Sequence, residues 1–551
     1  MRIALGQFNA TVGDLASNVE KMTKMWSQAV EAGADLVLFP ELAVCGYPPE
    51  DLVYKRQFVE DNRAALNDLA AACPRKTLVA GFVDSSNSEL FNAAAVIQEG
   101  RIGAIYHKAL LPNYSVFDEQ RYFVPGDEPV VFEVGGLRAA VTICQDIWDE
   151  RCLADVFGRI GRVDLVVNIS ASPFHMNKIQ ARCRVVAECA DIFGGAVAYC
   201  NLVGGQDELV FDGRSILADS TGRIVTMAKA CEEDLLLADI AADETGVHVR
   251  PLQPPTPQPQ GPVEEVYQAL VLGTRDYTHK NGFRQVLLGI SGGIDSAVTA
   301  AIAADALGPR NVICVTMPSR FNRPETIVDA KRVADNLGCS LLTIPIEPIL
   351  TPFNEALKAE PQWNEKGIAY ENLQARIRGM ILMSLSNQIG AMVLTTGNKS
   401  EVSVGYSTLY GDSAGGFATI KDVTKTMVYE LAEYINNLAG REVIPQDVIK
   451  RVPSAELRPN QTDQDSLPAY DLLDRIIAGY VEQDRSAREL VESGLPAEEV
   501  ERVIRMIDRN EYKRRQSAPG VRITPKAFGK DRRLPITNHY TTSVTKQQKP
   551  D

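Results

Sequence analysis

A glycine-rich turn between an apolar run and a helical run restricts the fold more than any other feature. Residues 285–297 read QVLLGISGGIDSA, in which Val286–Ile290 is expected to form a buried strand. The Ser-Gly-Gly turn at 291–293 lets the main chain approach an anion closely, and a helical run opens at Asp295. A strand, a glycine-rich turn and a helix start aim backbone N–H groups at a phosphate. Because a carboxylate repels phosphate, Asp295 predicts a Mg²⁺ ion between them.

Length and composition indicate an ordinary globular protein with more than one domain. The 551 residues exceed what one core supports, and 45% are hydrophobic and 23% charged. The net charge of −14 argues against nucleic-acid and membrane partners. The chain opens without the apolar run of a signal peptide and has no stretch long enough to span a membrane. Ten scattered cysteines without C-x-x-C pairs are typical of reduced thiols, so a cytoplasmic protein is expected.

A proline-rich segment divides the chain. Residues 248–262 contain six prolines, which exclude a core helix or a central strand and predict a stiff, extended linker. Before the linker, strand-like and helical runs predict an α/β sandwich domain over 1–247. After it, strands separated by helices predict a doubly wound parallel sheet in a domain over 263–540, with its ligand at the carboxyl ends of the strands. Residues 541–551 are expected to form a polar tail.

Three reactive side chains stand at predicted strand ends in the first domain. Glu41 follows DLVLFP, Lys108 follows RIGAIYH, and Cys144 follows LRAAVTI. Each alone has an ordinary explanation, since such a cysteine is usually a small buried hydrophobe and a loop Glu or Lys is usually solvated. Together they suit amide hydrolysis, because a thiol close to a base and a positive charge becomes a nucleophilic thiolate.

The first domain resembles the nitrilase, or carbon–nitrogen hydrolase, superfamily in the blocks FPELAVCGYPPEDL, YHKALLPNYSVFDEQRYF and TICQDIW. The resemblance covers nearly all of residues 1–245 and implies an αββα sandwich with a Glu-Lys-Cys triad. Cys144 would attack the carboxamide carbon, Glu41 would transfer protons, and Lys108 would stabilise the oxyanion. The blocks are most similar to the glutaminase branch, and ordinary polar loop residues are the alternative for its binding positions. Three residues are thereby implied to hold glutamine: Tyr114, Ser172 and Lys178.

The second domain resembles the ATP pyrophosphatases, which cleave ATP between its α and β phosphates, in the loop SGGIDS. The Walker A lysine and the G-x-G-x-x-G pattern are both missing. The blocks ENLQAR, TTGNKSE and GGFATIKDVTKT narrow the resemblance to NAD⁺ synthetases over about 263–540. With a glutaminase-like domain ahead, the whole chain is similar to the glutamine-dependent members. This implies that ATP adenylates a carboxylate of deamido-NAD⁺ and that ammonia from glutamine displaces AMP to give NAD⁺.

The same resemblance assigns binding residues in the second domain. Asp295 and Glu401 are the expected ligands of Mg²⁺, the implied cofactor. The residues implied to bind ATP are Gly289, Ile290, Ser291, Gly292, Gly293, Ile294, Asp295, Ser296 and Thr396. The residues implied to contact deamido-NAD⁺ are Asn372, Glu401 and Lys513, with Asp412 and Lys421 as weaker candidates.

Two positions in this domain have open assignments. Arg376 is either a nucleotide contact or a helix ion-pair residue. Asn398-Lys399 stands where many members of the family have Asp-His. This exchange is expected to change the local charge near the nucleotide.

Three functions remain in competition. The first is glutamine-hydrolysing NAD⁺ synthesis. The second is another ATP-driven amidation, since GMP and asparagine synthetases also have the loop, although these use other glutaminases and lack ENLQAR and TTGNKSE. The third is an amidase whose second half only senses nucleotide, and the intact Asp295, Thr396 and Glu401 count against it.

Two further expectations concern how the domains work together. Free ammonia is mostly ammonium at neutral pH and is then no nucleophile, so a sheltered ammonia tunnel between the two sites is expected. The family resemblance also implies a homodimer or larger homo-oligomer formed through the synthetase domain.

Overall fold

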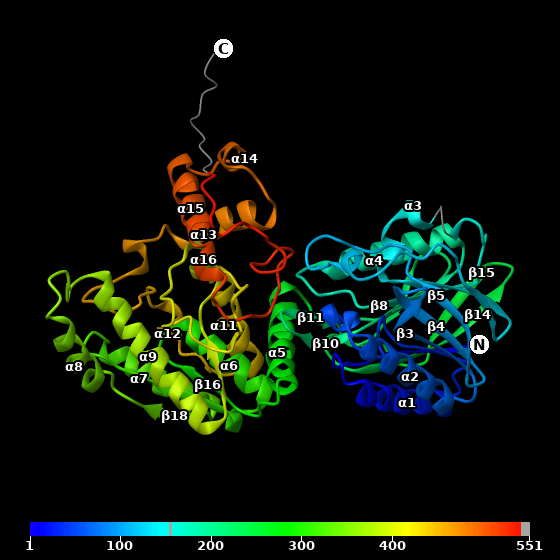
Figure 1. Ribbon diagram of the computed structural model, residues 1–551, viewed down its shortest axis with the longest axis horizontal. Helices are drawn as coiled ribbons and strands as arrows, with labels where there is room; N and C mark the ends of the chain where they lie inside the picture. Colours follow the sequence, from blue (N-terminus) through cyan, green and yellow to red (C-terminus); the bar gives the residue numbers. More distant parts are fainter. Residues whose placement is uncertain (154–156, 541–551) are drawn as a thin grey trace, which may run out of the picture. The chain divides into compact units, whose positions relative to one another are not determined.

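The computed structural model describes residues 1–153 and 157–540, which form two compact units (Figure 1). The division falls between Gln260 and Gly261, and each unit has its own sheets. The polar tail predicted over 541–551 lies outside the described residues. Within the described part of the chain, every helix is too short or too polar to cross a membrane.

The first unit is built on two large sheets. Seven strands pair in the order β15-β14-β1-β2-β3-β4-β5, six pair in the order β13-β12-β9-β8-β7-β6, and β10-β11 form a separate hairpin. The strands are β1 Arg2–Gln7, β2 Leu36–Leu38, β3 Thr77–Ser86, β4 Glu89–Gln98, β5 Arg101–His107, β6 Val131–Val134, β7 Leu137–Ile143, β8 Leu165–Ser170, β9 Ala196–Asn201, β10 Val203–Gln206, β11 Leu209–Asp212, β12 Ile216–Ala218, β13 Ile224–Met227, β14 Asp234–Asp243 and β15 Gly246–Pro251. The parallel strands β8 and β9 are buried along their whole length, as expected for strands covered on both faces.

Helices cover the sheets of the first unit and complete an αββα sandwich. Leu5 and Val141 meet in the core between the sheets, whereas Trp26 and Leu66 pack helices onto the outer face of the larger sheet. The helices are α1 Leu15–Glu31, α2 Arg56–Ala72, α3 Glu150–Cys152 and α4 Lys178–Phe193, with short helices η1 Glu50–Tyr54, η2 Glu119–Arg121 and η3 Cys144–Trp148. The predicted sandwich fold is confirmed.

The linker between the two units is shorter than the proline-rich sequence predicts. Residues 248–251 belong to β15, which pairs with β14 at the edge of the larger sheet. An edge strand tolerates a terminal proline because one side of its backbone needs no partner. The irregular connection therefore begins at Leu252, and the first helix of the second unit starts at Pro262, a favourable position for proline.

The second unit has a five-stranded sheet in the order β18-β17-β16-β19-β20, and every pairing is parallel. The strands are β16 Val286–Gly289, β17 Val312–Thr316, β18 Ser340–Thr343, β19 Met392–Thr395 and β20 Phe417–Ala418. The helices are α5 Pro262–Lys280, α6 Ile294–Leu307, α7 Pro324–Leu337, α8 Glu347–Leu357, α9 Ile368–Ile389, α10 Lys399–Val404, α11 Lys425–Ala439, α12 Gln446–Lys450, α13 Tyr470–Ile477, α14 Ala487–Glu492, α15 Ala497–Arg509 and α16 Glu511–Arg514, with short helices η5 Pro309–Asn311, η6 Asp463–Asp465 and η7 Ala478–Glu482.

The core of the second unit leaves the carboxyl ends of its central strands open. Leu287 on β16 and Val393 on β19 pack with Ile377 and other residues of α9, and α6 and α7 also contact the sheet. The doubly wound parallel fold is confirmed. The glycine-rich turn follows β16 and residues 396–398 follow β19, so both segments lie at the same edge of the sheet.

Candidate active sites

The first candidate site is a buried cluster of charges in the sandwich. The Lys108 ammonium donates to Glu41 Oε1 at 2.6 Å and to both oxygens of Glu119 at 2.9 Å. Glu41 also accepts from Asn92 Nδ2 at 2.7 Å and from the N–H of Ala171 at 2.8 Å. Burial alone would lower the pKa of Lys108, but Glu119 and Glu41 outweigh it and raise the pKa above its ordinary value. Lys108 is therefore a fixed positive charge.

Cys144 lies beside this cluster at the end of β7. It is 4% exposed and has a φ of 41°, a left-handed conformation that costs a residue with a Cβ about 1–3 kcal/mol. Burial, followed by the negative charge of Glu41, raises the pKa of the Cys144 thiol to about 12, and Lys108 opposes this. The thiol is thus protonated at rest, and its ionisation needs a neighbouring base.

Of the three residues expected to hold glutamine, Tyr114 and Lys178 contact the turn Cys144–Trp148. The Tyr114 hydroxyl donates to Gln145 Oε1 at 2.8 Å, and the Lys178 ammonium lies 5.7 Å from the centre of the Trp148 ring. Ser172 is buried just beyond β8. The role of these three residues in binding glutamine stays a prediction.

Two buried charged residues bond to the backbone beside Ser172 and beside Cys144. Arg182 is fully buried, donates to the Ser172 carbonyl oxygen at 2.8 Å and pairs with Asp212 at 2.7 Å. Asp146 accepts from the N–H of Ile143 at 2.8 Å and from the N–H of Leu110 at 2.9 Å. Asp146 thus ties the strand before Cys144 to the segment after Lys108.

The second candidate site begins at the turn after β16. Gly292 has a φ of +83°, and a Cβ there would lie 2.0 Å from the Thr326 carbonyl oxygen, so only glycine fits. The N–H of Gly293 donates to Ser291 Oγ at 3.2 Å, and Ser296 Oγ donates to the Gly293 carbonyl at 2.9 Å. These contacts fix the turn at the N-terminus of α6, which suits a phosphate.

Two carboxylates meet beside this turn around one ammonium. Lys425 contacts Asp295 Oδ2 and lies 3.4 Å from Glu401 Oε1, and Asn398 Nδ2 donates to Asp295 Oδ1 at 2.8 Å. Burial raises the pKa of Glu401 to about 8; Lys425 opposes this, and Asp295 and Asp463 add to it. Glu401 therefore resists ionisation where it stands, and a second cation beside it would favour its carboxylate form.

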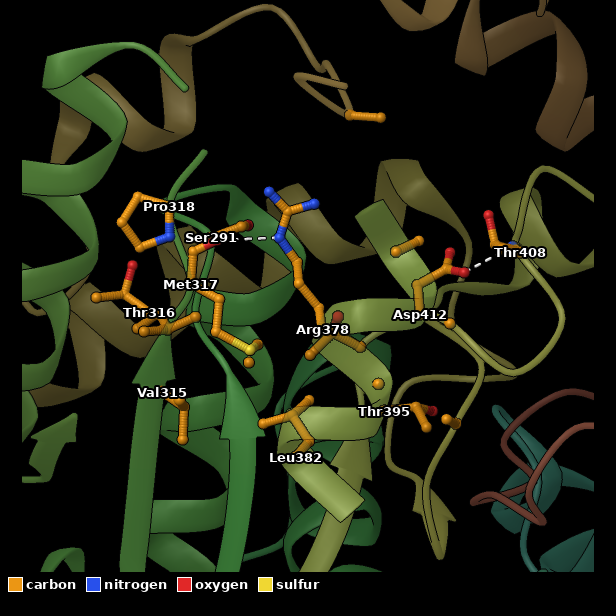
Figure 2. Close-up of a pocket in the computed structure, with 18 of the residues that line it drawn as sticks. Ser291, Val315, Thr316, Met317, Pro318, Arg378, Leu382, Thr395, Thr408 and Asp412 are labelled. Carbon is orange, nitrogen blue, oxygen red and sulfur yellow. Dashed lines mark hydrogen bonds between the residues drawn. The ribbon is translucent and has the colours of Figure 1, made fainter. Parts of the chain in front are cut away.

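Adjoining cavities connect the predicted nucleotide residues. One is lined by Gly289–Ser291, the ends of β17 and β19, and α9, and Figure 2 shows Arg378 lying in it between Ser291 and Asp412. The next is lined by the turn 291–296 with Thr396 and Glu401. A third shares Glu401 and is also lined by Asp412, Lys421 and Lys513.

Two predicted substrate residues bond to the protein itself. Lys513 donates to the carbonyl oxygens of Gly405 at 2.7 Å and Ser407 at 2.9 Å. Asn372 Oδ1 accepts from the Thr408 hydroxyl at 2.7 Å and is absent from the three cavity walls as described. Both side chains therefore hold the segment 405–408. An ammonium has three N–H donors, so these two bonds do not exclude a ligand from Lys513, which lines the third cavity. Arg376, the open assignment, donates to the Leu409 carbonyl at 3.2 Å.

The expected change of charge near the nucleotide can involve Asn398, which bonds to Asp295, but not Lys399. The side chain of Lys399 is fully buried, pairs with Asp422 at 2.9 Å and Glu482 at 2.8 Å, and lines none of the three cavities described. Only Asn398 of the pair faces the site. The residues before and after a helix start point in different directions, which sequence proximity does not reveal.

Sequence reasoning missed three residues that the structure brings to these sites. Glu119 lies within the quoted block YHKALLPNYSVFDEQRYF and contacts Lys108, and Lys425 lies within GGFATIKDVTKT and contacts Asp295. Arg451 donates to the Gly292 carbonyl at 3.2 Å and lines the cavity formed by the turn 291–296 with Thr396 and Glu401. For Glu119 and Lys425, the available signal was that each is a charged residue inside a block that resembles the family.

Comparison with known proteins gives consistent matches along the chain. The carbon–nitrogen hydrolase family matches residues 2–247, and the NAD synthase family matches residues 266–517. A glutamine-dependent NAD(+) synthetase of Thermotoga maritima is 43% identical and covers 98% of this chain and 99% of its own. One from Xanthomonas campestris is 46% identical, with 98% of each chain covered. The solved structure of the Acinetobacter baumannii glutamine-dependent NAD+ synthetase with adenosine diphosphate is 41% identical, covers 98% of this chain and 99% of that one, and has a TM-score of 0.77.

The two folds define an enzyme in which a nitrilase-type amide hydrolase precedes an NAD synthase domain. Such a chain is a carbon–nitrogen ligase with its own nitrogen-releasing half. With relatives of 43% and 46% identity along nearly their full length, the chain belongs to the glutamine-dependent NAD(+) synthetase family.

Proposed function

We propose that this chain converts deamido-NAD⁺ to NAD⁺ with ATP and takes the nitrogen from glutamine. One observation supports this most directly: a single chain combines a buried Glu41–Lys108 pair beside a thiol with a phosphate-type loop beside paired carboxylates. The first arrangement suits amide hydrolysis. The second suits transfer of an adenylyl group to a carboxylate, which turns its oxygen into a leaving group.

In the first half-reaction the glutamine carboxamide would lie beside Cys144. Glu41 would accept the thiol proton as sulfur attacks the carbon, and Lys108 would stabilise the negative oxygen. Glu41 would then pass the proton to departing ammonia and later activate a water against the thioester. The fully buried position of Glu41 supports this role, because little water competes for the proton.

In the second half-reaction ATP would lie across the adjoining cavities. Its base would enter the cavity of Arg378 and Leu382, and its phosphates would meet the turn at 291–296 and Thr396. The nicotinate carboxylate would lie near the third cavity, between Glu401 and Lys513. Lys425 and the N–H groups of the turn would balance the charge of departing pyrophosphate.

The donor set beside the turn fits Mg²⁺. Mg²⁺ in such enzymes takes one or two carboxylates and completes its shell with phosphate oxygens and water. Asp295 and Glu401 supply two carboxylates that already share a cationic neighbour, and the described residues hold no group of three potential metal ligands that would favour a dedicated protein site. Bound there, Mg²⁺ would neutralise phosphate charge.

The test of this function is a product balance in the presence of Mg-ATP, deamido-NAD⁺ and ammonium. We expect NAD⁺, AMP and pyrophosphate in equal amounts, and no AMP when deamido-NAD⁺ is left out. When glutamine replaces ammonium, glutamate release without any AMP would support a nucleotide-sensing amidase instead. AMP formation only with some other carboxylate would support a different amidation.

Transfer of ammonia through a sheltered tunnel is part of the proposal. Protonation would otherwise convert released ammonia to ammonium in water. During glutamine-dependent turnover, added hydroxylamine should therefore capture little of the nitrogen. Capture at a rate comparable with NAD⁺ formation would exclude the tunnel.

We further propose that the chain forms a homodimer or larger homo-oligomer through the synthetase unit. Met380 and Met383 are exposed three residues apart on α9, the arrangement of an apolar helix face that another protein surface can cover. Sedimentation analysis should give at least twice the monomer mass. Replacing Met380 with Glu should lower that mass, whereas Ile192→Glu, an exposed apolar position on α4, should leave it unchanged.

The cytoplasm is the proposed compartment. None of the ten cysteines forms a disulfide in the described structure, which suits a reducing environment. Cell fractionation would contradict this if the protein were found outside the cytoplasmic fraction.

A further inference from the structure

Helix α10 supplies the edge of the synthetase site and is very short. It has six residues, Lys399–Val404, and begins directly after the Asn398 cap. A helix of this length has little stability of its own, so its orientation depends on what its residues contact. Glu401, in its first turn, faces Lys425 and the carboxylate of Asp295.

The three residues before Glu401 each fasten this first turn to a different part of the unit. Asn398 Nδ2 donates to Asp295 Oδ1 at 2.8 Å, which connects the turn to α6. The Ser400 hydroxyl donates to Asp474 of α13 and accepts from the N–H of Lys425 at 2.8 Å. The remaining residue, Lys399, points away from the site.

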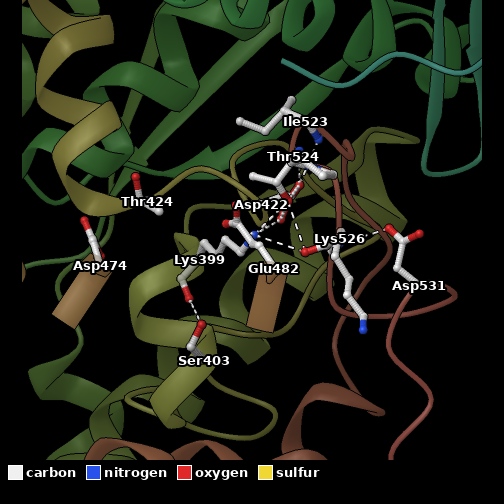
Figure 3. A network of polar contacts seen from close by, with 12 residues as sticks. Lys399, Ser403, Asp422, Thr424, Asp474, Glu482, Ile523, Thr524, Lys526 and Asp531 are labelled. Carbon is white, nitrogen blue, oxygen red and sulfur yellow. Dashed lines mark hydrogen bonds and ion pairs between the residues drawn. The ribbon is translucent and has the colours of Figure 1, made fainter. Parts of the chain in front are cut away.

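Lys399 is the centre of a buried polar network (Figure 3). Its ammonium lies 2.9 Å from Asp422, 2.8 Å from Glu482 and 2.7 Å from the hydroxyl of Thr524. Asp422 in turn accepts from the N–H groups of Ile523 at 2.8 Å and Thr524 at 2.7 Å. Lys399 therefore joins α10 to the segment 522–526 in two ways. One connection is its direct contact with Thr524, and the other runs through Asp422.

The network differs from ordinary core packing in its chemistry. A buried charge among carboxylates is weak evidence for stability, because apolar side chains of similar volume often serve as well. Its hydrogen bonds are directional, however, and therefore restrict how α10 can rotate or slide. Asp422 and Glu482 are the anionic partners of the Lys399 ammonium.

We propose that Lys399 is a positioning residue of the synthetase site: it locks the first turn of α10 to the segment 522–526 and thereby holds Glu401 beside Asp295. The inference rests on the proposed function, since it assigns Lys399 to the ATP-dependent half. It makes that half dependent on a segment more than 100 residues away in sequence. The glutaminase half does not contain the network and should not depend on it.

The test compares the full-length Lys399→Met variant with Lys526→Met. Lys526 is the matched control, because it lies in the same segment and its ammonium pairs with the exposed Asp484. With ammonium as nitrogen source, Lys399→Met should lower kcat on the order of tenfold to a hundredfold, as expected for a displaced catalytic group. The KM for ATP should change by less than about twofold. The reason is that Lys399 and its partners do not line the cavity of Arg378 and Leu382, in which the base of ATP is proposed to bind.

Three further readouts separate positioning from general damage. Lys399→Arg keeps the charge and should retain more activity than Lys399→Met. Amide hydrogen exchange over 398–404 should accelerate in Lys399→Met and not in Lys526→Met. Glutamate release from glutamine without ATP should be the same in every variant.

Thr524→Val keeps the proposal testable if Lys399→Met does not fold. It removes one hydroxyl from the ammonium and should produce a smaller loss of kcat with the same unchanged KM. The proposal is overturned if a folded variant of either residue keeps wild-type kcat and exchange, or loses no more kcat than Lys526→Met. A wild-type protein that makes no NAD⁺ would refute the proposed function alone, and the exchange comparison would still decide the role of Lys399.

Discussion

Glu119 controls how the charge of Lys108 acts on Glu41. Both Glu119 oxygens accept from the Lys108 ammonium, so Lys108 is shared between two carboxylates. Glu119→Gln would leave Glu41 as the single anionic partner and make it a weaker base. We expect glutaminase kcat to fall on the order of a hundredfold, with ammonium-dependent NAD⁺ synthesis unchanged.

The control for this substitution is Glu133→Gln, on the exposed face of β6. Steady-state assays of glutamate release and of ammonium-dependent synthesis would make the comparison. Equal loss of both activities in Glu119→Gln would contradict a local role for Glu119.

Asp146 gives the first unit a pH-dependent stability. Burial is the main cause that raises its pKa from 3.8 to about 6, against the lowering effect of the N–H groups of Ile143 and Leu110. Because the folded-state pKa is raised, the contribution of Asp146 is fully present below about pH 4 and is lost as pH rises through about 6. The loss amounts to about 3 kcal/mol.

Thermal unfolding can isolate this contribution. The melting temperature of wild type minus that of Asp146→Asn should be larger at pH 5 than at pH 8. Asp68→Asn, on the exposed face of α2, should show no such trend. A wild-type minus Asp146→Asn difference that is independent of pH would contradict the assignment.

Individual residues of the first candidate site could be predicted from sequence where a family motif coincided with the end of a predicted strand. Glu41, Lys108 and Cys144 were predicted in this way, and the structure places them in one buried cluster. Glu119 and Lys399 were not understood from sequence, because a motif match does not reveal which way a neighbouring side chain points. Their positions depend on contacts with residues distant along the chain, such as Lys399 with Thr524.

The turn between β16 and α6 is the element on which the synthetase half depends most. Gly292→Ala would place a Cβ 2.0 Å from the Thr326 carbonyl at a φ of +83°. The turn would have to move, and ammonium-dependent synthesis should fall at least tenfold while glutamate release persists.

Gly308→Ala is the matched control at the other end of α6. Its φ is +82°, yet a Cβ there meets no atom within 4 Å. It reproduces the backbone strain without the collision. Similar loss of synthesis in both variants would show that strain alone, and not the fit of the turn, is responsible.

Element boundaries followed from sequence where apolar pattern and end signals agreed. The strand expected at Val286–Ile290 is β16, which ends one residue earlier, at Gly289. The linker prediction was wrong at its start, because proline content does not reveal that an edge strand is available for pairing. The helices α13–α15 went unpredicted, since they depend on contacts with one another in a shared core that includes Leu473 and Val503.

At the scale of the whole molecule, the chain combines two compact units, each with a candidate site of its own. The first has a buried Glu41–Lys108 pair beside the Cys144 thiol, and the second has a glycine-rich turn beside two carboxylates. Their presence in one chain supports a reaction in which the product of the first is the substrate of the second. The central claim is therefore that nitrogen passes from the Cys144 site to the site of Asp295 and Glu401.

The measurement that tests this claim most directly is product analysis of wild type and Cys144→Ala with Mg-ATP and deamido-NAD⁺. With glutamine, wild type should form NAD⁺, AMP and glutamate, and Cys144→Ala should form none of them above background. With ammonium, both proteins should form NAD⁺. The account would be contradicted if Cys144→Ala still used glutamine, or if wild type released glutamate but formed no NAD⁺ from either nitrogen source.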